Sequence, residues 1–202
     1  MIRTLMLAVL AGAVFSPAAV LADTAAQAKD CEGCHGNNGV SEWSDVPTIA
    51  GISAGVHGDY LLSYKDKSRP CTKSKYRQGD TKRSETDMCT VAAKLSEADI
   101  DALAAYFAAK PFKAAKQTVD AAKAAAGKTI HARDCEKCHE GNGRKADADA
   151  SILAGQWMPY LTTEMNAFVA GTRPQPKKMA EKMKALKAAD IDALVHFYAS
   201  QP

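Results

Sequence analysis

Aromatic side chains are scarce in this sequence of 202 residues, because Phe, Trp and Tyr together make up only 6%. A large excess of charge of one sign is also missing, since 26 Lys and Arg are balanced by 23 Asp and Glu and leave a net charge of +3. This balance excludes the strong basic field of a nucleic-acid-binding protein, and the stacking aromatics of such a protein are lacking too. Small domains with so few large side chains are short of apolar surface to bury. We therefore expect something besides side chains to complete the core.

Long apolar segments are absent except near the N-terminus, where Leu5 to Phe15 follows the positive charge of Arg3. A short apolar stretch of this kind, followed by the small residues around Ala22, is typical of a secretory signal peptide. The alternative is an uncleaved membrane anchor, but the stretch is shorter than the roughly 20 residues that a span requires. The sequence therefore predicts a signal peptide over residues 1–22, a periplasmic location and no stable membrane insertion.

Two halves of the chain repeat one another in the same order. Residues 30–35 (DCEGCH) recur as residues 134–139 (DCEKCH), and residues 98–103 (ADIDAL) recur exactly as residues 189–194. The loops between these segments differ in length, as is usual for homologous domains. We therefore expect an N-terminal domain over 23–108, a linker over 109–126 and a C-terminal domain over 127–202.

Both repeats have a helical pattern. Ser96 and Asp99 have the spacing of a capping box, and Ile100, Leu103 and Phe107 follow at the spacing of one helix face. Sustained strand alternation is not found in either half. The sequence therefore predicts an all-α protein of two tandem domains.

Each repeat carries a Cys-x-x-Cys-His motif, the attachment signature of c-type haem, in which two thiols bind the porphyrin and the His ligates the iron. A zinc half-site and a thioredoxin-like redox pair are the competing interpretations. However, zinc sites seldom need a His directly after both pairs, and no βαβ pattern accompanies the cysteines. Two covalently bound haem c groups, with their iron, are therefore predicted at Cys31, Cys34 and His35 and at Cys135, Cys138 and His139.

A methionine on the opposite face of the iron would favour electron transfer over catalysis. Met88 is the only methionine after the signal peptide in the first half, and it lies seven residues before Leu95. Met179 lies seven residues before Leu186, which occupies the same place in the second repeat. We therefore predict Met88 and Met179 as the distal iron ligands. The other candidates are Met158, Met165 and Met183, and, for bis-His ligation, His57, His131 and His196.

Cys71 and Cys89 are left over, and neither has a counterpart in the second half. In an exported protein, two such cysteines most simply form a disulfide, here one that closes the loop before Met88. Alternatively, Cys89 could ligate the iron as a thiolate in place of its neighbour Met88. Both interpretations are compatible with the sequence.

Basic residues gather in two stretches, residues 64–83 and residues 173–187, which adjoin the two predicted methionine ligands. They could steer acidic redox partners toward the haem edges, or they could simply be solvated surface.

The second half combines the motif at 135–139 with residues 152–157 (ILAGQW), 159–161 (PYL) and 177–180 (KKMA) and with the C-terminal FYASQ. In these segments it resembles the dihaem cytochrome subunit of flavocytochrome c sulfide dehydrogenase. The resemblance covers most of residues 111–202. Over 23–110 only the haem motif, the methionine and the terminal helix match. Two departures from the family pattern are the Cys71/Cys89 insertion and Ser151, which stands where the first half has Pro47.

The resemblance implies two class I cytochrome c domains, each built around one haem, with His35 and His139 as proximal ligands. In such domains a Pro carbonyl commonly supports the proximal His. The family subunit forms a heterodimer with a flavoprotein that carries FAD and oxidises sulfide, and it passes the electrons to a soluble redox acceptor. This chain has no nucleotide-binding glycine motif, which agrees with the flavin being on another chain.

The expected function is therefore electron transfer in sulfide oxidation, in a protein that has no catalytic residues of its own. A second hypothesis is a free dihaem carrier that feeds a terminal oxidase. A third is a dihaem thiosulfate-oxidising enzyme whose haem has a Cys ligand.

Overall fold

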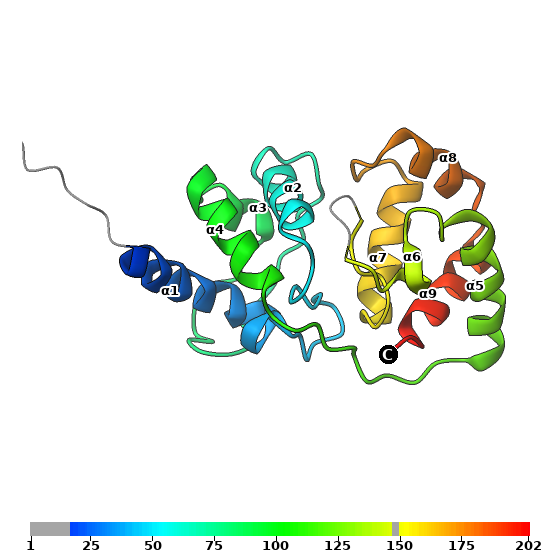
Figure 1. Cartoon of the computed structure of the whole chain (residues 1–202), viewed down its shortest axis with the longest axis horizontal. Coiled ribbons are helices and arrows are strands. Elements are labelled where there is room, and N and C mark those ends of the chain that lie inside the picture. The colour runs from blue at the N-terminus through cyan, green and yellow to red at the C-terminus, as the bar shows by residue number, and fades with distance from the viewer. Residues whose placement is uncertain (1–16, 147–149) are drawn as a thin grey trace, which may run out of the picture.

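The computed structural model describes residues 17–146 and 150–202, which form helices joined by loops (Figure 1). These residues form no β-strand, and an isolated β-bridge joins Ser74 to Thr86. The predicted all-α class is therefore confirmed. The helices are α1 (Pro17–His35), the 3-10 helix η1 (Asn37–Gly39), α2 (Ala54–Lys65), α3 (Met88–Ala92), α4 (Glu97–Ala108), α5 (Ala121–Asp134), α6 (Glu140–Gly143), α7 (Met158–Val169), α8 (Lys177–Ala185) and α9 (Ala188–Ala199).

Most of the predicted signal peptide over residues 1–22 lies outside the described residues, and residues 17–22 belong to the start of α1. None of the helices in the described part of the chain combines the length and the apolar character that a membrane span requires.

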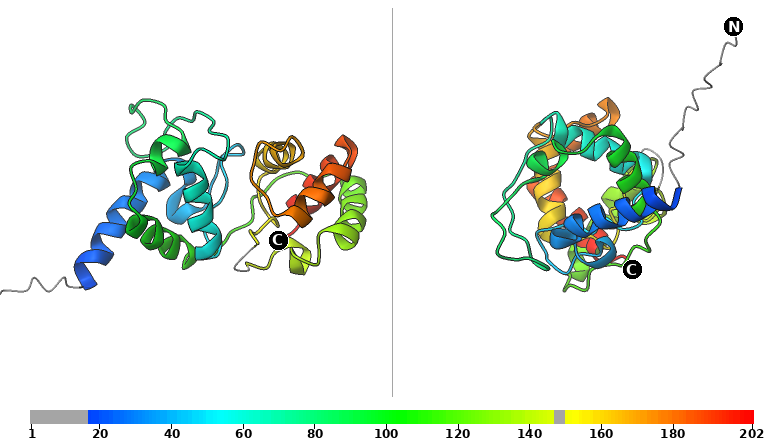
Figure 2. Two further views of the ribbon diagram at one scale, coloured as in Figure 1. Left: turned by 90° about the horizontal axis from the view of Figure 1, so that it is seen from above. Right: turned by 90° about the vertical axis from the view of Figure 1, so that its left-hand side faces the viewer.

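The helices form two groups, α1–α4 and α5–α9, which we call domain 1 and domain 2 (Figures 1 and 2). An extended segment without helix, residues 111–120, joins them. The two-domain architecture agrees with the sequence repeat. The exact boundaries at 23–108 and 127–202 stay predictions.

The repeat is also visible in the backbone hydrogen bonds of the two domains. In domain 1, the amides of Ile49 and Ala50 both donate to the Gly39 carbonyl, at 2.7 and 3.1 Å. In domain 2, the amides of Leu153 and Ala154 donate to Gly143 in the same way, at 2.8 and 3.0 Å. Both glycines have a positive φ, 77° and 81°, which explains why each repeat keeps a glycine there. The loop after each haem motif therefore folds in the same way twice.

The first and last helices of each domain pack against one another. In domain 1, the buried residues Ala28 on α1 and Leu103 and Phe107 on α4 form a cluster with only these three buried members. The predicted capping box begins α4, because the Ser96 hydroxyl accepts from the Asp99 amide at 3.1 Å and the Asp99 carboxylate accepts from the Ser96 amide at 2.9 Å.

In domain 2, helices α5 and α9 cross closely at Gly127. A side chain at this position would overlap the backbone carbonyl of Ala193 and would lie 2.7 Å from Cβ of Phe197. Glycine is therefore required because the two helix backbones nearly touch there.

A buried glutamine joins the two domains. The Gln156 side chain accepts from the Thr48 amide at 3.1 Å and donates to the Thr48 carbonyl at 2.6 Å. The Trp157 indole next to it donates to the Ser41 carbonyl at 3.0 Å. From the linker, the Gln117 side chain donates to the Gln156 carbonyl at 2.8 Å. Because an unpaired buried amide is costly, these bonds hold the domains in one arrangement.

Two buried arginines reinforce the contact between the domains. Arg69 of domain 1 and Arg173 of domain 2 both pair with the Glu164 carboxylate on α7, the former at 2.9 Å. The ring of Tyr60 on α2 lies under both guanidinium groups, 4.7 and 4.8 Å from them. Both arginines belong to the basic stretches of the sequence, but they are 4% and 6% exposed. For these two arginines both interpretations of the basic stretches, steering of acidic partners and solvated surface, are therefore wrong.

The close crossing of α5 and α9 predicts opposite effects for two Gly→Ala changes. Gly127→Ala should lower the free energy of unfolding by about 1–3 kcal/mol, because the new methyl group overlaps the backbone of α9. Gly58→Ala in α2 is the matched control, since nothing lies within 4 Å of a Cβ there. It should raise stability by about 0.5–1 kcal/mol through helix propensity. Denaturant unfolding of the haem-loaded protein checks both, and equal effects would contradict the crossing.

Candidate functional site

In domain 1, the predicted haem ligands lie at the C-terminal end of α1. Cys31, Cys34 and His35 lie within its last five residues, and His35 is buried. Nδ1 of His35 lies 3.0 Å from the Pro47 carbonyl. A carbonyl only accepts, so Nδ1 carries the hydrogen and the neutral ring keeps its lone pair on Nε2. Burial lowers the pKa of His35 and so favours this neutral form, which is the form that binds a metal.

In domain 2, the same motif forms a turn directly after α5. Cys135 caps this helix, and the amides of Cys138 and His139 donate to its carbonyl at 3.1 and 2.9 Å. Burial lowers the pKa of His139, with a smaller contribution from His131 and an opposing one from the Ser151 backbone. Nδ1 of His139 is buried, and its contact with the Ser151 backbone does not have the geometry of a regular hydrogen bond. Ser151 stands at the repeat position of Pro47, and the hydrogen-bond support of the proximal His is weaker there than in domain 1.

A glutamate inside each motif, which the sequence analysis did not single out, supports the turn that follows. The Glu32 carboxylate accepts from the Asn38 amide at 3.1 Å. The Glu136 carboxylate accepts from the Gly141 amide at 2.9 Å and from the Asn142 amide at 3.3 Å. Its presence in both copies of the motif was the signal that could have revealed this role.

The thiols of the two motifs are suited to covalent haem attachment. All four are free, as thioether formation requires. Burial raises the pKa of Cys31 to about 12, so this thiol is neutral in the protein. At neither motif does the described chain bring together three side chains that could hold a metal ion. The donor set therefore fits haem c better than a zinc site, which needs thiolates and four ligands. His35 and His139 are the side chains that would hold the iron from one side.

The predicted distal ligands begin or lie within a short helix of each domain. Met88 is the first residue of α3, and the carboxylate of the preceding Asp87 caps this helix by accepting from the Thr90 amide at 2.7 Å. Hydrogen bonds from Lys73 and Thr90 lower the pKa of Asp87 to about 2. Met179 lies on α8, half-buried against the core of domain 2. Both assignments stay predictions, although the half-buried positions are compatible with them.

The other methionines and histidines considered as iron ligands pack in the core or form hydrogen bonds within the protein. Met165 and Met183 are buried within the core of domain 2, and Met158 packs against it. Nε2 of His57 is 2.7 Å from the Ile49 carbonyl. His131 uses both ring nitrogens, with the Tyr198 hydroxyl at 2.9 Å and the Glu136 carboxylate. His196 accepts from the Asp120 amide at 3.0 Å. These contacts give each histidine a structural role.

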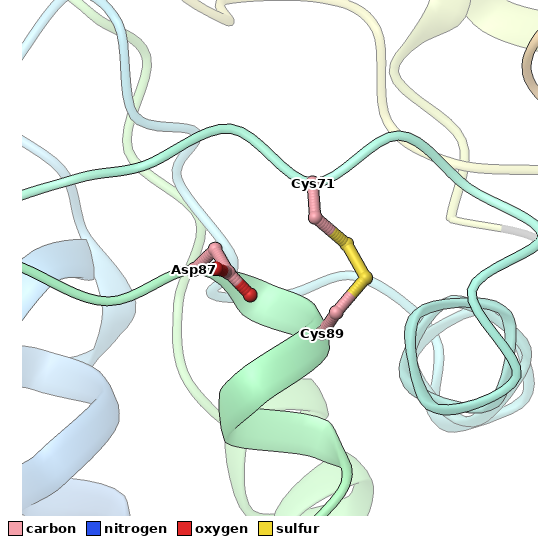
Figure 3. A group of neighbouring side chains, drawn as sticks. All are labelled: Cys71, Asp87 and Cys89. Carbon is pink, nitrogen blue, oxygen red and sulfur yellow. A yellow bond between two sulfur atoms is a disulfide. The ribbon is translucent and has the colours of Figure 1, made fainter.

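Cys71 and Cys89 form a disulfide with a Cα–Cα distance of 5.8 Å (Figure 3). The bond joins the loop after α2 to the first turn of α3, next to Met88. The sulfur of Cys89 is thus engaged and is not a free thiolate for the iron. Asp87 lies beside the disulfide (Figure 3).

The sequence profile of the cytochrome c family matches residues 20–109 and again residues 124–201. The chain belongs to the cytochrome c family. Both matched segments contain one complete Cys-x-x-Cys-His motif. Covalently bound haem c in each domain follows, and the protein is a dihaem c-type cytochrome that carries electrons.

Individual relatives agree with this family. The chain is 28% identical over 185 residues to the thiosulfate dehydrogenase electron acceptor of Stutzerimonas stutzeri, covering 84% of this chain and 78% of that protein. Cytochrome c4 of Acidithiobacillus ferrooxidans matches with a TM-score of 0.68 and 28% identity, over 85% of this chain and 99% of that one. A thiosulfate dehydrogenase of Marichromatium purpuratum matches with a TM-score of 0.70 and 25% identity, over 92% of this chain but 40% of that one.

The two methionine assignments predict separate spectroscopic outcomes. Met88→Ala and Met179→Ala should each remove one of two Met–iron charge-transfer bands, while both haems stay covalently attached. Met183→Ala is the matched control on the same helix as Met179. Because Met183 is a buried core residue, it should lose about 2–5 kcal/mol of stability and keep both bands. Loss of a band in Met183→Ala, with none lost in Met179→Ala, would mean that the helix register in domain 2 is wrong.

Proposed function

We propose that this chain is a periplasmic electron-transfer subunit. It accepts electrons from a separate enzyme that oxidises a reduced sulfur compound and passes them to a soluble acceptor. The observation that carries the proposal is the fixed arrangement of two haem-attachment turns in one molecule. One turn ends α1, the other follows α5, and buried hydrogen bonds between Thr48 and Gln156 join their domains.

Bound haem supplies one-electron redox chemistry in each domain. The chain contributes ligands, burial and a constant distance between the two centres. The Pro47 carbonyl fixes the tautomer of His35 that leaves Nε2 free to bind iron, and burial favours the neutral ring. The Arg69–Glu164–Arg173 cluster ties α7 to the loop after α2. A relay needs little rearrangement during electron transfer, and these buried contacts oppose movement of one domain against the other.

The electron donor that we propose first is an FAD-containing sulfide dehydrogenase flavoprotein, in a heterodimer with this chain. Support comes from residues of domain 2 that resemble the cytochrome subunit of such enzymes, among them Gln156, Trp157 and Met179. Two of these, Gln156 and Trp157, make the contacts between the domains. In this complex the cytochrome chain needs no catalytic residue of its own.

A second candidate donor is the catalytic subunit of a thiosulfate dehydrogenase. The S. stutzeri relative, by its name, accepts electrons from such an enzyme. A stand-alone thiosulfate-oxidising enzyme is less well supported, because it would need an open or thiolate-ligated iron and Cys89 is in a disulfide. A free carrier to a terminal oxidase would share the same two domains and differ only in its partner.

Purification of the untagged protein from its native periplasm tests the proposal. We expect a stoichiometric second subunit with flavin absorbance, and haem reduction when sulfide is added. Thiosulfate should reduce the complex only if the partner is a thiosulfate dehydrogenase, in which case the flavin is absent.

The matched control is the haem-loaded cytochrome alone, which should not be reduced by either compound at the rate of the complex. The proposal would be contradicted if the protein is isolated without a partner and if neither sulfide nor thiosulfate reduces it in periplasmic extract. This outcome would favour the free carrier instead.

A further inference from the structure

The disulfide closes a loop that lies against the haem motif of domain 1. This clipped loop, residues 71–89, is fastened to the motif by backbone contacts. The amides of Arg77 and Gln78 donate to the Gly33 carbonyl at 2.7 and 3.2 Å. The Gln78 side chain donates to the Glu32 carbonyl at 2.8 Å. The Cys34 thiol lies 3.6 Å from the Lys75 carbonyl. The clipped loop therefore covers the outer side of the first haem-attachment turn.

The residue between the two motif cysteines differs between the domains in a way that matches this cover. At Gly33, a Cβ would lie 2.8 Å from the ring of Tyr76, which belongs to the clipped loop. The repeat counterpart of Gly33 is Lys137, an exposed residue. The missing side chain in domain 1 thus makes room for the loop, whereas domain 2 extends a charged side chain from the same position.

The charges of the clipped loop are mostly neutralised. Lys73 pairs with Asp87 at 2.6 Å and Lys75 with Glu85 at 3.7 Å, within the loop. Arg77 and Arg83 pair with carboxylates outside it, Asp45 at 2.6 Å and Asp30 at 2.8 Å. Four of the five basic residues of the clipped loop are thus ion-paired, and two of these pairs fasten the loop to the rest of domain 1.

The corresponding side of domain 2 has no such cover among the described residues. Cys138 is exposed, whereas Cys34 is not. Only residues 170–176 connect α7 to α8, and this short connection replaces the clipped loop. The second haem-attachment turn is therefore the more accessible of the two.

Helix α8 borders this accessible turn and is strongly basic. Lys182 pairs with Asp134, the residue before the motif, at 2.9 Å, which fixes α8 beside it. Lys177, Lys178 and Lys184 are exposed and make no ion pair with any described residue. Glu181 is the one acidic residue on the helix. We call α8 together with residues 135–139 the open face.

We propose that the open face of domain 2 is where a redox protein with an acidic surface docks and exchanges electrons, while the clipped loop closes the equivalent face of domain 1. The partner is identified by charge complementarity, because uncompensated lysines border an exposed attachment turn. Such a field raises the rate of association with anionic partners by tenfold or more. The inference rests on the proposed exchange with other proteins but not on the sulfur compound involved.

Electron exchange with two inorganic reagents of opposite charge tests the open face. In the haem-loaded protein, Lys178→Glu/Lys184→Glu should slow oxidation by ferricyanide, a trivalent anion, about tenfold at low ionic strength. The same variant should speed oxidation by the trivalent cation tris(phenanthroline)cobalt. Effects of opposite sign cannot arise from damage to the fold, which would change both rates alike.

The matched control is Lys113→Glu/Lys116→Glu in the linker, where both lysines are exposed. It makes the same change in net charge, so at each ionic strength its rates should change less than those of the α8 variant. At an ionic strength of about 0.1 M, where the screening length is about 10 Å, they should stay within about twofold of the parent. Equal effects of the two variants, or no effect of the α8 variant, would overturn the proposal.

A binding measurement gives a second readout that does not depend on electron transfer. Poly-L-glutamate is added to the haem-loaded protein as an acidic probe, and amide hydrogen exchange is followed by mass spectrometry. Protection is expected over residues 135–139 and 177–187 and not over 71–89. Protection of the clipped loop instead would place the docking face on domain 1 and overturn the inference. Neither readout involves sulfide or thiosulfate, so both hold even if the proposed sulfur-oxidising partner is wrong.

Discussion

The close crossing of the first and last helix is the constraint on which each domain depends. In domain 2 this crossing requires Gly127 on α5, because the backbone of α9 passes directly over it. The haem motif follows directly at the end of α5, so the crossing fixes where the motif lies. Gly155 then donates from its amide to the Tyr198 carbonyl on α9 at 2.8 Å, as Gly51 does to Phe107 on α4 at 2.9 Å. One packing contact therefore positions the motif, the loop after it and the terminal helix together.

The two repeats share this frame but differ in what surrounds the haem motif. Domain 1 has a Pro47 carbonyl on its proximal His and a clipped loop over its haem motif. Domain 2 has a proximal His139 without a regular hydrogen bond at Nδ1 and an uncovered motif beside a basic helix. In the proposed relay each domain would meet a different partner, and these differences would suit the two domains to that.

Much of the fold could be predicted from the sequence because its signals are local. The repeated motif, the Ser96–Asp99 capping box and the apolar face of α4 depend on residues that are near one another in the chain. The burial of Arg69 and Arg173 could not be predicted, since their shared partner Glu164 and the ring of Tyr60 come from distant segments. The sequence predicted the disulfide of the clipped loop as one of two alternatives. The contact of this loop with Gly33 could not be predicted, because it depends on the tertiary structure. In the sequence, this contact is reflected only in the difference between Gly33 and Lys137.

Four of the six cysteines should bind haem and the other two form a disulfide, and the intact mass of the protein from its native source tests this division most directly. If the predicted signal peptide is removed, we expect the mass of residues 23–202 plus two haem groups, less two hydrogens for one disulfide. Without reduction no cysteine should react with an alkylating reagent, and after reduction only Cys71 and Cys89 should react. A protein with fewer than two covalent haems, or with Cys71 and Cys89 alkylated before reduction, would contradict the account.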